Sequence, residues 1–333
     1  MRILLRPRRP VLALLLFAPG IAELLTGSTP ITRLFFDPIG FLLSFGFDVA
    51  LYGTGALLIR EFAVVFRKGW ASILLLGAAY GIAEEGFAVH TFFQATGSPV
   101  NALGTYGHAF GVNWVWALGL SVFHATYSIA LPILLTQLWF PLVKDVRWFD
   151  PSALGLVGAI YLATVVIFDV TSGHGPSPAA FALFLAVALL LVGLARWIPR
   201  NLLAVGPGRA RVGPWGIALA GTLGFDAWIL VLLLSTSRLP AIITAAIFVL
   251  IDLGALALVL RRLGADDLEG SKFWFATGML GILFVWDVAV AEFSVPGIVL
   301  VSAVFAYVQY RLGTTLRARG VLAPLGADAP SAG

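Results

Sequence analysis

The sequence predicts an all-α fold, a polytopic transmembrane helical bundle of about ten spans with both termini in the cytoplasm. Three observations lead to this prediction. Of the 333 residues, 60% are hydrophobic and only 11% are charged, and the mean hydropathy is +0.97. The apolar residues form continuous runs, whereas the strands of a membrane barrel alternate apolar and polar residues. The Lys and Arg residues gather on alternate connecting loops.

The composition also excludes several classes of protein. A soluble domain carries roughly 25% charged residues, so a soluble enzyme, a nucleic-acid-binding protein and a disordered chain are all excluded. The sequence contains no Cys, which excludes disulfides, thiolate chemistry and Cys-ligated metals. We therefore expect a multi-pass protein of the plasma membrane. Its expected partners are the lipid bilayer and a peptide, lipid-linked or small-molecule substrate, with no nucleic acid.

Each expected span is an apolar run of roughly 20 residues, the length that crosses a hydrocarbon core about 30 Å thick. In chain order the runs lie at residues 10–27, 38–60, 70–93, 112–140, 152–171, 179–197, 214–235, 240–260, 273–292 and 296–312. They form one integral membrane domain over residues 1–317, followed by a disordered cytoplasmic tail over residues 318–333. The first run resembles a signal peptide, but its apolar residues continue to residue 25, which favours a retained helix kinked near Pro19.

The basic residues define the orientation. With the N-terminus in the cytoplasm, every Lys and Arg except Arg33 and Arg238 falls on the cytoplasmic side. Each span reverses the side of every loop that follows it, so a missed or added span would scatter these residues over both sides. The partition therefore favours about ten spans with both termini inside.

Ionisable residues inside the predicted spans are candidates for function, since each costs roughly 2.5–3.5 kcal/mol on insertion scales. They are Asp48, Glu84, Glu85, Asp226, Asp252 and, nearer the span ends, Glu23, Asp169, Asp287 and Glu292. No Lys or Arg lies near the middle of a span to pair with them. The carboxyl groups must therefore be protonated, hydrogen-bonded, solvated in a cavity or bound to a cation.

Depth in the bilayer groups some of these residues together. A rise of about 1.5 Å per residue places Glu84, His124, Asp48 and Asp252 about 14–18 Å below the outer surface. The third and fourth spans are consecutive and antiparallel, so Glu84 or Glu85 can readily meet His124. We expect the remaining residues of a cavity, or of a proton or cation pathway, to be Asp226, His90 and Asn113.

The third span carries the most informative segment. Gly77 and Gly81 leave one helix face without side chains, which allows a close approach by another helix. Glu84 and Glu85 follow and point about 100° apart on an α-helix, so that one can face a cavity while the other bonds to a neighbouring helix. Alternatively, both glutamates are packing residues and His124 is a core histidine bonded to a hydroxyl or carbonyl group.

A double glutamate on one span and a histidine in the middle of the next resemble the CAAX protease and bacteriocin-processing (CPBP) intramembrane protease family. The pattern of that family is EExxxR, then FxxxH, then HxxxN on a later helix. The resemblance implies that Glu84 is the general base, that Glu85 assists it and that His124 positions the water or the oxyanion. This chain departs from the pattern at Val89, in place of Arg, and at Leu120, in place of Phe, and no later span contains a histidine.

Three functions are compatible with these residues. The first is an intramembrane hydrolase of the metallo- or glutamate type, the second a secondary transporter coupled to protons or cations, and the third a non-catalytic scaffold. No H-E-x-x-H motif is present, so no metal site is predicted. Were a metal bound, its best ligands would be Glu84, Glu85 and His124. The identity of any cofactor stays open.

Overall fold

The computed structural model describes residues 8–95, 105–173, 175–203, 213–223, 239–262, 268–289 and 291–322. The α-helices are α1 (Arg8–Pro19), α2 (Arg33–Phe36), α3 (Pro38–Asp48), α4 (Thr54–Val65), α5 (Trp70–Gly81), α6 (Trp114–Phe123), α7 (Leu131–Trp139), α8 (Pro151–Thr171), α9 (Pro178–Trp197), α11 (Ala241–Arg262), α12 (Leu268–Ala289) and α13 (Ile298–Ala318). Residues 214–223 are also helical. Within the described ranges, four π-helical segments interrupt these helices: η1 (Gly20–Leu24), η2 (Val49–Gly53), η3 (Ile82–Ala88) and η6 (His124–Ala130).

Shorter elements occupy the connections. The 3₁₀ turns are η4 (Thr91–Phe93), η7 (Pro141–Val143) and η9 (Ala291–Phe293). Strands β1 (His108–Ala109) and β2 (Val112–Asn113) form one antiparallel pair in which His108 lies opposite Asn113. This hairpin leads directly into α6, so the chain enters the fourth predicted span from a fixed turn.

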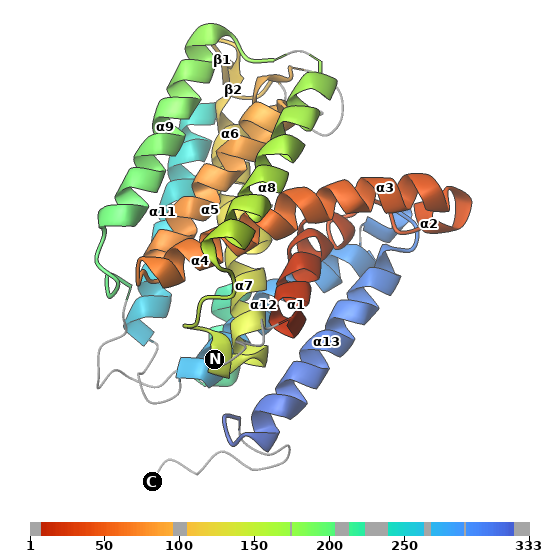
Figure 1. Ribbon diagram of the computed structural model, residues 1–333, viewed down its shortest axis with the longest axis vertical. Helices are drawn as coiled ribbons and strands as arrows, with labels where there is room; N and C mark the ends of the chain where they lie inside the picture. Colours follow the sequence, from red (N-terminus) through yellow and green to blue (C-terminus); the bar gives the residue numbers. More distant parts are fainter. Residues whose placement is uncertain are drawn as a thin grey trace.

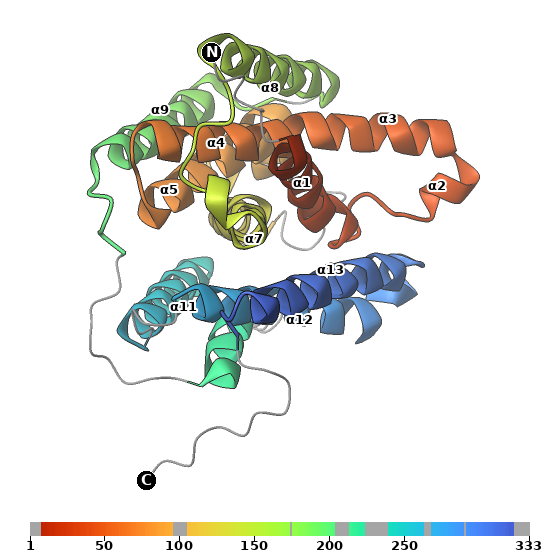
Figure 2. The ribbon, with the colours of Figure 1, turned by 60° about the horizontal axis from the view of Figure 1, so that its bottom comes forward.

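The helices form two layers, as Figure 2 shows: α1 to α9 in one and α11 to α13 in the other. A cluster of buried apolar side chains joins the layers, with Ile21 and Leu131 on one side and Leu280, Val301 and Phe305 on the other. Long helices run side by side through the first layer (Figure 1), and a second apolar cluster holds α1, α4 and α5 together within it. The layer of α1 to α9 also contains the buried polar residues described below.

Among the described residues, seven helices are long and apolar enough to cross a membrane. They are Pro38–Val65, Trp70–Ala88, Trp114–Trp139, Pro151–Thr171, Pro178–Trp197, Glu269–Ala289 and Ile298–Ala318, and each matches one predicted span. The predicted span at residues 240–260 corresponds to helix α11, of which Ala241–Gly254 is a shorter apolar helix. The first predicted span is the α1–η1 helix, and most of the run at residues 214–235 lies outside the described residues.

The π-helical form of these segments is not evident from the sequence. Two of them adjoin a proline: η1 follows Pro19, and η6 ends just before Leu131-Pro132. Proline has no N–H to donate to the preceding turn and its ring displaces the carbonyl four residues back, so the regular α ladder is interrupted there. The predicted kink near Pro19 thus takes the form of a π-helical turn.

Candidate functional site

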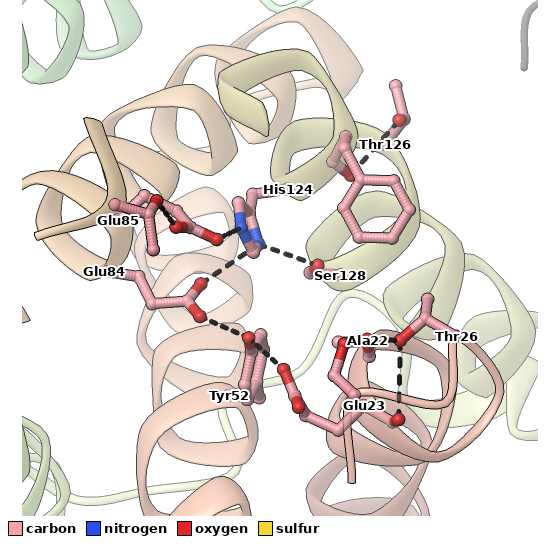
Figure 3. Close-up of polar contacts among 12 residues, drawn as sticks. Ala22, Glu23, Thr26, Tyr52, Glu84, Glu85, His124, Thr126 and Ser128 are labelled. Atoms are coloured by element: carbon pink, nitrogen blue, oxygen red, sulfur yellow. Dashed lines mark hydrogen bonds and ion pairs between the residues drawn. The ribbon is translucent and has the colours of Figure 1, made fainter. Parts of the chain in front are cut away.

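Each of the four π-helical segments contributes a polar side chain to one buried centre. Glu23 comes from η1, Tyr52 from η2, Glu84 and Glu85 from η3, and His124 from η6 (Figure 3). A π-helical turn holds an extra residue and rotates the side chains relative to an α-helix, and such turns are frequent at functional sites. Among the buried members, His124 is 2% exposed, Glu84 4% and Glu85 8%.

Two glycines allow η3 and η6 to meet. A Cβ added at Gly77 would lie 2.7 Å from the Cα of Ala125, and one added at Gly81 would lie 3.0 Å from the Cβ of His124. No side chain larger than hydrogen fits at these positions unless η6 moves away. The predicted close approach of a helix to the Gly77–Gly81 face is confirmed, and it places the two glutamates beside His124.

His124 lies between the two glutamates. Its Nδ1 is 3.0 Å from Oε2 of Glu84, and its Nε2 is 3.1 Å from Oε1 of Glu85. The Oγ of Ser128 lies 2.9 Å from the same Nδ1, and Oε2 of Glu84 accepts no hydrogen bond of good geometry. Both glutamates therefore face the imidazole ring, from its two nitrogen-bearing edges. The expectation that one of them would turn to a cavity and the other to a neighbouring helix is replaced by a shared contact with His124.

A series of hydrogen bonds leads from Glu85 to neighbouring side chains. The hydroxyl group of Thr91 donates to Oε2 of Glu85, and Nε1 of Trp116 donates to that hydroxyl oxygen at 3.0 Å. Asn113 is completely buried, and its amide donates to the backbone carbonyls of Thr91 and Gln94. Asn113, predicted to line a cavity or pathway, thus fixes the backbone of the residue that bonds to Glu85.

A second series of polar contacts leads from Glu84 toward Asp48. The hydroxyl group of Tyr52 contacts Oε1 of Glu84 and, at 2.5 Å, Oε1 of Glu23. The hydroxyl group of Thr29 contacts Oε2 of Glu23 at 3.3 Å and Oδ2 of Asp48 at 3.0 Å. The structure therefore joins Asp48 to Glu84 through two hydroxyl groups and one further carboxyl group. Asp48 was predicted to lie in the same layer of the membrane as Glu84, and these contacts connect the two residues.

Three other predicted site residues lie apart from these contacts. His90 is buried in a left-handed backbone conformation, φ 63°, and its Nε2 lies 2.9 Å from Oδ1 of Asp169. It therefore connects the segment after η3 to α8. For Asp252, on α11, the described part of the chain shows no hydrogen bond or ion pair to the centre. Asp226 lies outside the described residues.

Sequence reasoning gave Glu23 only a place near a span end, and it missed Tyr52, Thr29 and Thr91. A glutamate in an apolar run is a visible signal, and Glu23 could have been weighted more strongly. The hydroxyl residues carry no charge, so their presence in a span costs little and attracts no attention. One weak signal exists for Tyr52: it lies four residues after Asp48, one helical turn away.

The centre is rich in acidic groups. Across the described residues, no Lys or Arg forms an ion pair with Glu23, Asp48, Glu84 or Glu85. Glu84, Glu85 and His124 each offer one ligand atom, and the three atoms lie within 4.8 Å of one another. Two carboxylates and an imidazole form a ligand set suited to zinc. Because the glutamates approach His124 from opposite edges, a cation bound to all three would replace at least one of the observed contacts.

The chain matches an uncharacterized membrane protein family over residues 12–323 and belongs to that family. Comparisons with curated proteins and with solved structures give no match. With the apolar helices, this membership identifies the protein as a multi-pass membrane protein.

Proposed function

We propose that this family member is an intramembrane hydrolase acting on a peptide or lipid-linked substrate, with its reaction centre at Glu84, Glu85 and His124. The observation that carries the proposal is the position of His124 between the two glutamates, at 3.0 and 3.1 Å, in a buried layer. A carboxylate beside an imidazole can remove a proton from water and then return it to a leaving group.

In the proposed reaction, Glu84 accepts a proton from a water molecule while the water oxygen attacks the substrate carbonyl carbon. A protonated His124 donates a hydrogen bond to the resulting oxyanion, and Glu85 stabilises the positive charge on the ring. The carbonyl then re-forms, the bond to the leaving group breaks, and the proton on Glu84 moves to that group. These roles agree with those that the CPBP resemblance implies for the same residues.

A second candidate is proton- or cation-coupled transport. It is favoured by the series of polar contacts that joins Asp48 to Glu84 and continues through His124 to Glu85, which has no counterpart in a minimal hydrolytic pair. Membrane carboxylates of this kind are common in ion pathways. This candidate predicts that substrate moves only when an ion gradient is applied.

Hydrolysis in heavy-oxygen water distinguishes the two candidates. Purified protein in liposomes is given a library of lipidated and unmodified membrane peptides, and new carboxyl ends are examined by mass spectrometry. We expect incorporation of the heavy oxygen by the wild type and none by Glu84→Gln. The matched control is Asp287→Asn, since Asp287 is a completely buried carboxyl group bonded to Ser302 on other helices, and this variant should retain hydrolysis. Equal incorporation by wild type and Glu84→Gln contradicts the proposal.

The expected location is the plasma membrane, as the composition and the basic loops suggest. Fractionation of cells that express the tagged protein tests this part of the proposal. Recovery in an internal membrane, with correct folding, would contradict it without affecting the assignment of the reaction centre.

A further inference from the structure

The phenol of Tyr52 contacts two carboxyl oxygens but carries a single proton. It bonds to Oε1 of Glu84 and to Oε1 of Glu23, and all three side chains are buried or nearly so (Figure 3). A hydroxyl group donates one hydrogen bond, and a carboxylate can only accept. If both contacts are hydrogen bonds, one of the two carboxyl groups must carry a proton and donate it to the phenol oxygen.

The same count applies one step further along. The hydroxyl group of Thr29 contacts Oε2 of Glu23 and Oδ2 of Asp48, again with one proton for two carboxyl groups. Satisfying all four contacts therefore requires two protons shared among three carboxyl groups. When Glu84 and Asp48 carry these protons, Glu23 is the carboxylate that accepts from both hydroxyl groups. Moving one proton through Tyr52 then ionises Glu84 and protonates Glu23, and all four contacts are kept.

From this count we propose that Tyr52 and Glu23 form a proton store for Glu84. In the transfer, protonated Glu84 gives its proton to the Tyr52 oxygen while Tyr52 gives its own proton to Glu23. Glu84 is left as a carboxylate, Tyr52 stays neutral and Glu23 becomes protonated, so charge and protons balance. The reverse transfer protonates Glu84 again. Tyr52 and Glu23 are positioning residues, because they act on the reaction only through Glu84.

The use of this store rests on the proposed hydrolase function, whereas the sharing of the proton does not. A general base must be ionised when water attacks and protonated when the leaving group departs. With Glu23 as the acceptor, Glu84 loses its proton before the water attacks without exchange with bulk water. The proton that Glu84 then takes from the water goes to the leaving group. Removing the phenol proton donor breaks the connection and leaves both carboxyl groups in place.

Tyr80 provides a matched control for Tyr52. Both tyrosines are buried, at 4% and 3% exposure, and their ring centroids lie 5.9 and 6.0 Å from that of His124. The hydroxyl group of Tyr80 has no hydrogen-bond partner among the described residues, whereas that of Tyr52 joins two carboxyl groups. Replacing either tyrosine by Phe removes one oxygen at nearly constant volume.

Infrared spectroscopy of the purified wild type and variants, in light and heavy water, tests the store through the carbonyl-stretch band of protonated carboxyl groups. We expect a wild-type band that shifts in heavy water, moves to a different frequency in Tyr52→Phe, loses intensity in Glu23→Gln and is unchanged in Tyr80→Phe. A band identical in wild type, Tyr52→Phe and Glu23→Gln overturns the store.

The two proposals can fail separately. If Tyr52→Phe shifts the band but wild type incorporates no heavy oxygen into peptides, the store stands and the hydrolase function fails. If wild type hydrolyses peptides and Tyr52→Phe has the wild-type band and wild-type turnover, the store fails and the hydrolase function stands. Should Tyr52→Phe not fold, the loss of band intensity in Glu23→Gln decides the question alone.

Discussion

Arg60 and His124 are both buried, but the charges around them differ. Arg60 pairs with Glu61 and stacks on Trp148, with 3.7 Å from the guanidinium carbon to the ring centroid, so its charge is balanced. His124 faces two glutamates, and Glu23 adds a third carboxyl group through Tyr52. An excess of acidic groups in a buried layer opposes folding, and it is the pattern expected of a functional site.

Arg60 should therefore be a structural residue. Its guanidinium donates to three carbonyls of the loop after α7, those of Val143, Lys144 and Val146. Replacing it by Met leaves Glu61 buried without its ion-pair partner, and we expect a loss of about 3–5 kcal/mol of stability. Arg60→Lys should also lose stability, because one ammonium group cannot reproduce the planar set of donors of a guanidinium group. Thermal and chemical unfolding in detergent measure the effect, and wild-type stability of Arg60→Met would contradict it.

For individual residues, the sequence indicated the ionisable members of the site but not its neutral hydroxyl residues. Glu84, Glu85 and His124 stand out in apolar runs because burying them is costly. Tyr52, Thr29 and Thr91 do not, since hydroxyl groups are tolerated in membrane helices. Their roles depend on three-dimensional distances between different helices, which no spacing along one helix predicts.

The buried centre depends on close helix packing at two glycines, which carry no side chain. The GxxxG spacing predicted that a neighbour would pack on Gly77 and Gly81, and η6 does so. The π-helical form of η3 and η6 was not predicted, because a π turn depends on tertiary context more than on composition. Hydropathy thus predicted the helices. The π-helical geometry that orients Glu84, Glu85 and His124 toward one another is known only from the structure.

Gly77→Ala should separate η3 from η6. The added Cβ meets the backbone of Ala125 at 2.7 Å, and this backbone cannot rotate away, so we expect a loss of about 1–3 kcal/mol of stability and a loss of the proposed hydrolysis. The control is Gly193→Ala in α9, where nothing lies within 4 Å of the added Cβ. That variant should be neutral or slightly stabilising, since Ala favours helix more than Gly. Equal melting temperatures for the two variants would contradict this account of the packing.

The start of α13 predicts a pH dependence. Glu292, a partly exposed residue before the helix, accepts hydrogen bonds from the N–H groups of Gly297 and Val299, at 2.8 and 3.1 Å. These bonds lower the pKa of Glu292 below its ordinary value of 4.5. A lowered pKa in the folded state stabilises the protein above the unfolded-state pKa, and this stabilisation disappears as the pH falls through the folded-state value.

Glu292→Gln should therefore melt below wild type at neutral pH, and the difference should shrink as the pH falls below about 4.5. Melting curves of both proteins over an acid-to-neutral series measure it. Asp145→Asn, at an exposed pair with Arg200, serves as a control without bonds to a helix N-terminus and should show a smaller dependence. A difference that is constant with pH would exclude a role for the ionised carboxylate.

For the whole molecule, hydropathy predicted the transmembrane fold well. Seven predicted spans coincide with helices able to cross a membrane, because the length of an apolar run is a direct physical requirement. The total of about ten spans and the cytoplasmic termini stay predictions, as does the disordered tail, whose residues 323–333 lie outside the described part of the chain. The arrangement of α11 to α13 as a separate layer could not be read from the sequence, which contains no signal for lateral packing order.

The absence of cysteine makes the topology simple to test. Single cysteines at Val146 and Ser172, in the loops that precede and follow α8, should fall on opposite sides of the membrane. A membrane-impermeant maleimide added to intact cells should label Ser172→Cys and not Val146→Cys. Cysteines introduced at Arg2 and Ser331 should be protected in intact cells and labelled after lysis. Labelling of either terminus in intact cells would contradict an even number of spans with cytoplasmic ends.

We propose that Glu84, Glu85 and His124 serve chemistry and do not simply hold helices together. The most direct measurement compares the melting temperatures of wild type, Glu84→Gln and Arg60→Met in detergent. Gln keeps the size of Glu and removes its charge from an acidic buried centre, so we expect Glu84→Gln to melt at or above wild type and Arg60→Met to melt well below it. A fall in melting temperature for Glu84→Gln as large as that for Arg60→Met would mean that the glutamate is a packing residue, and it would contradict the proposed chemical role.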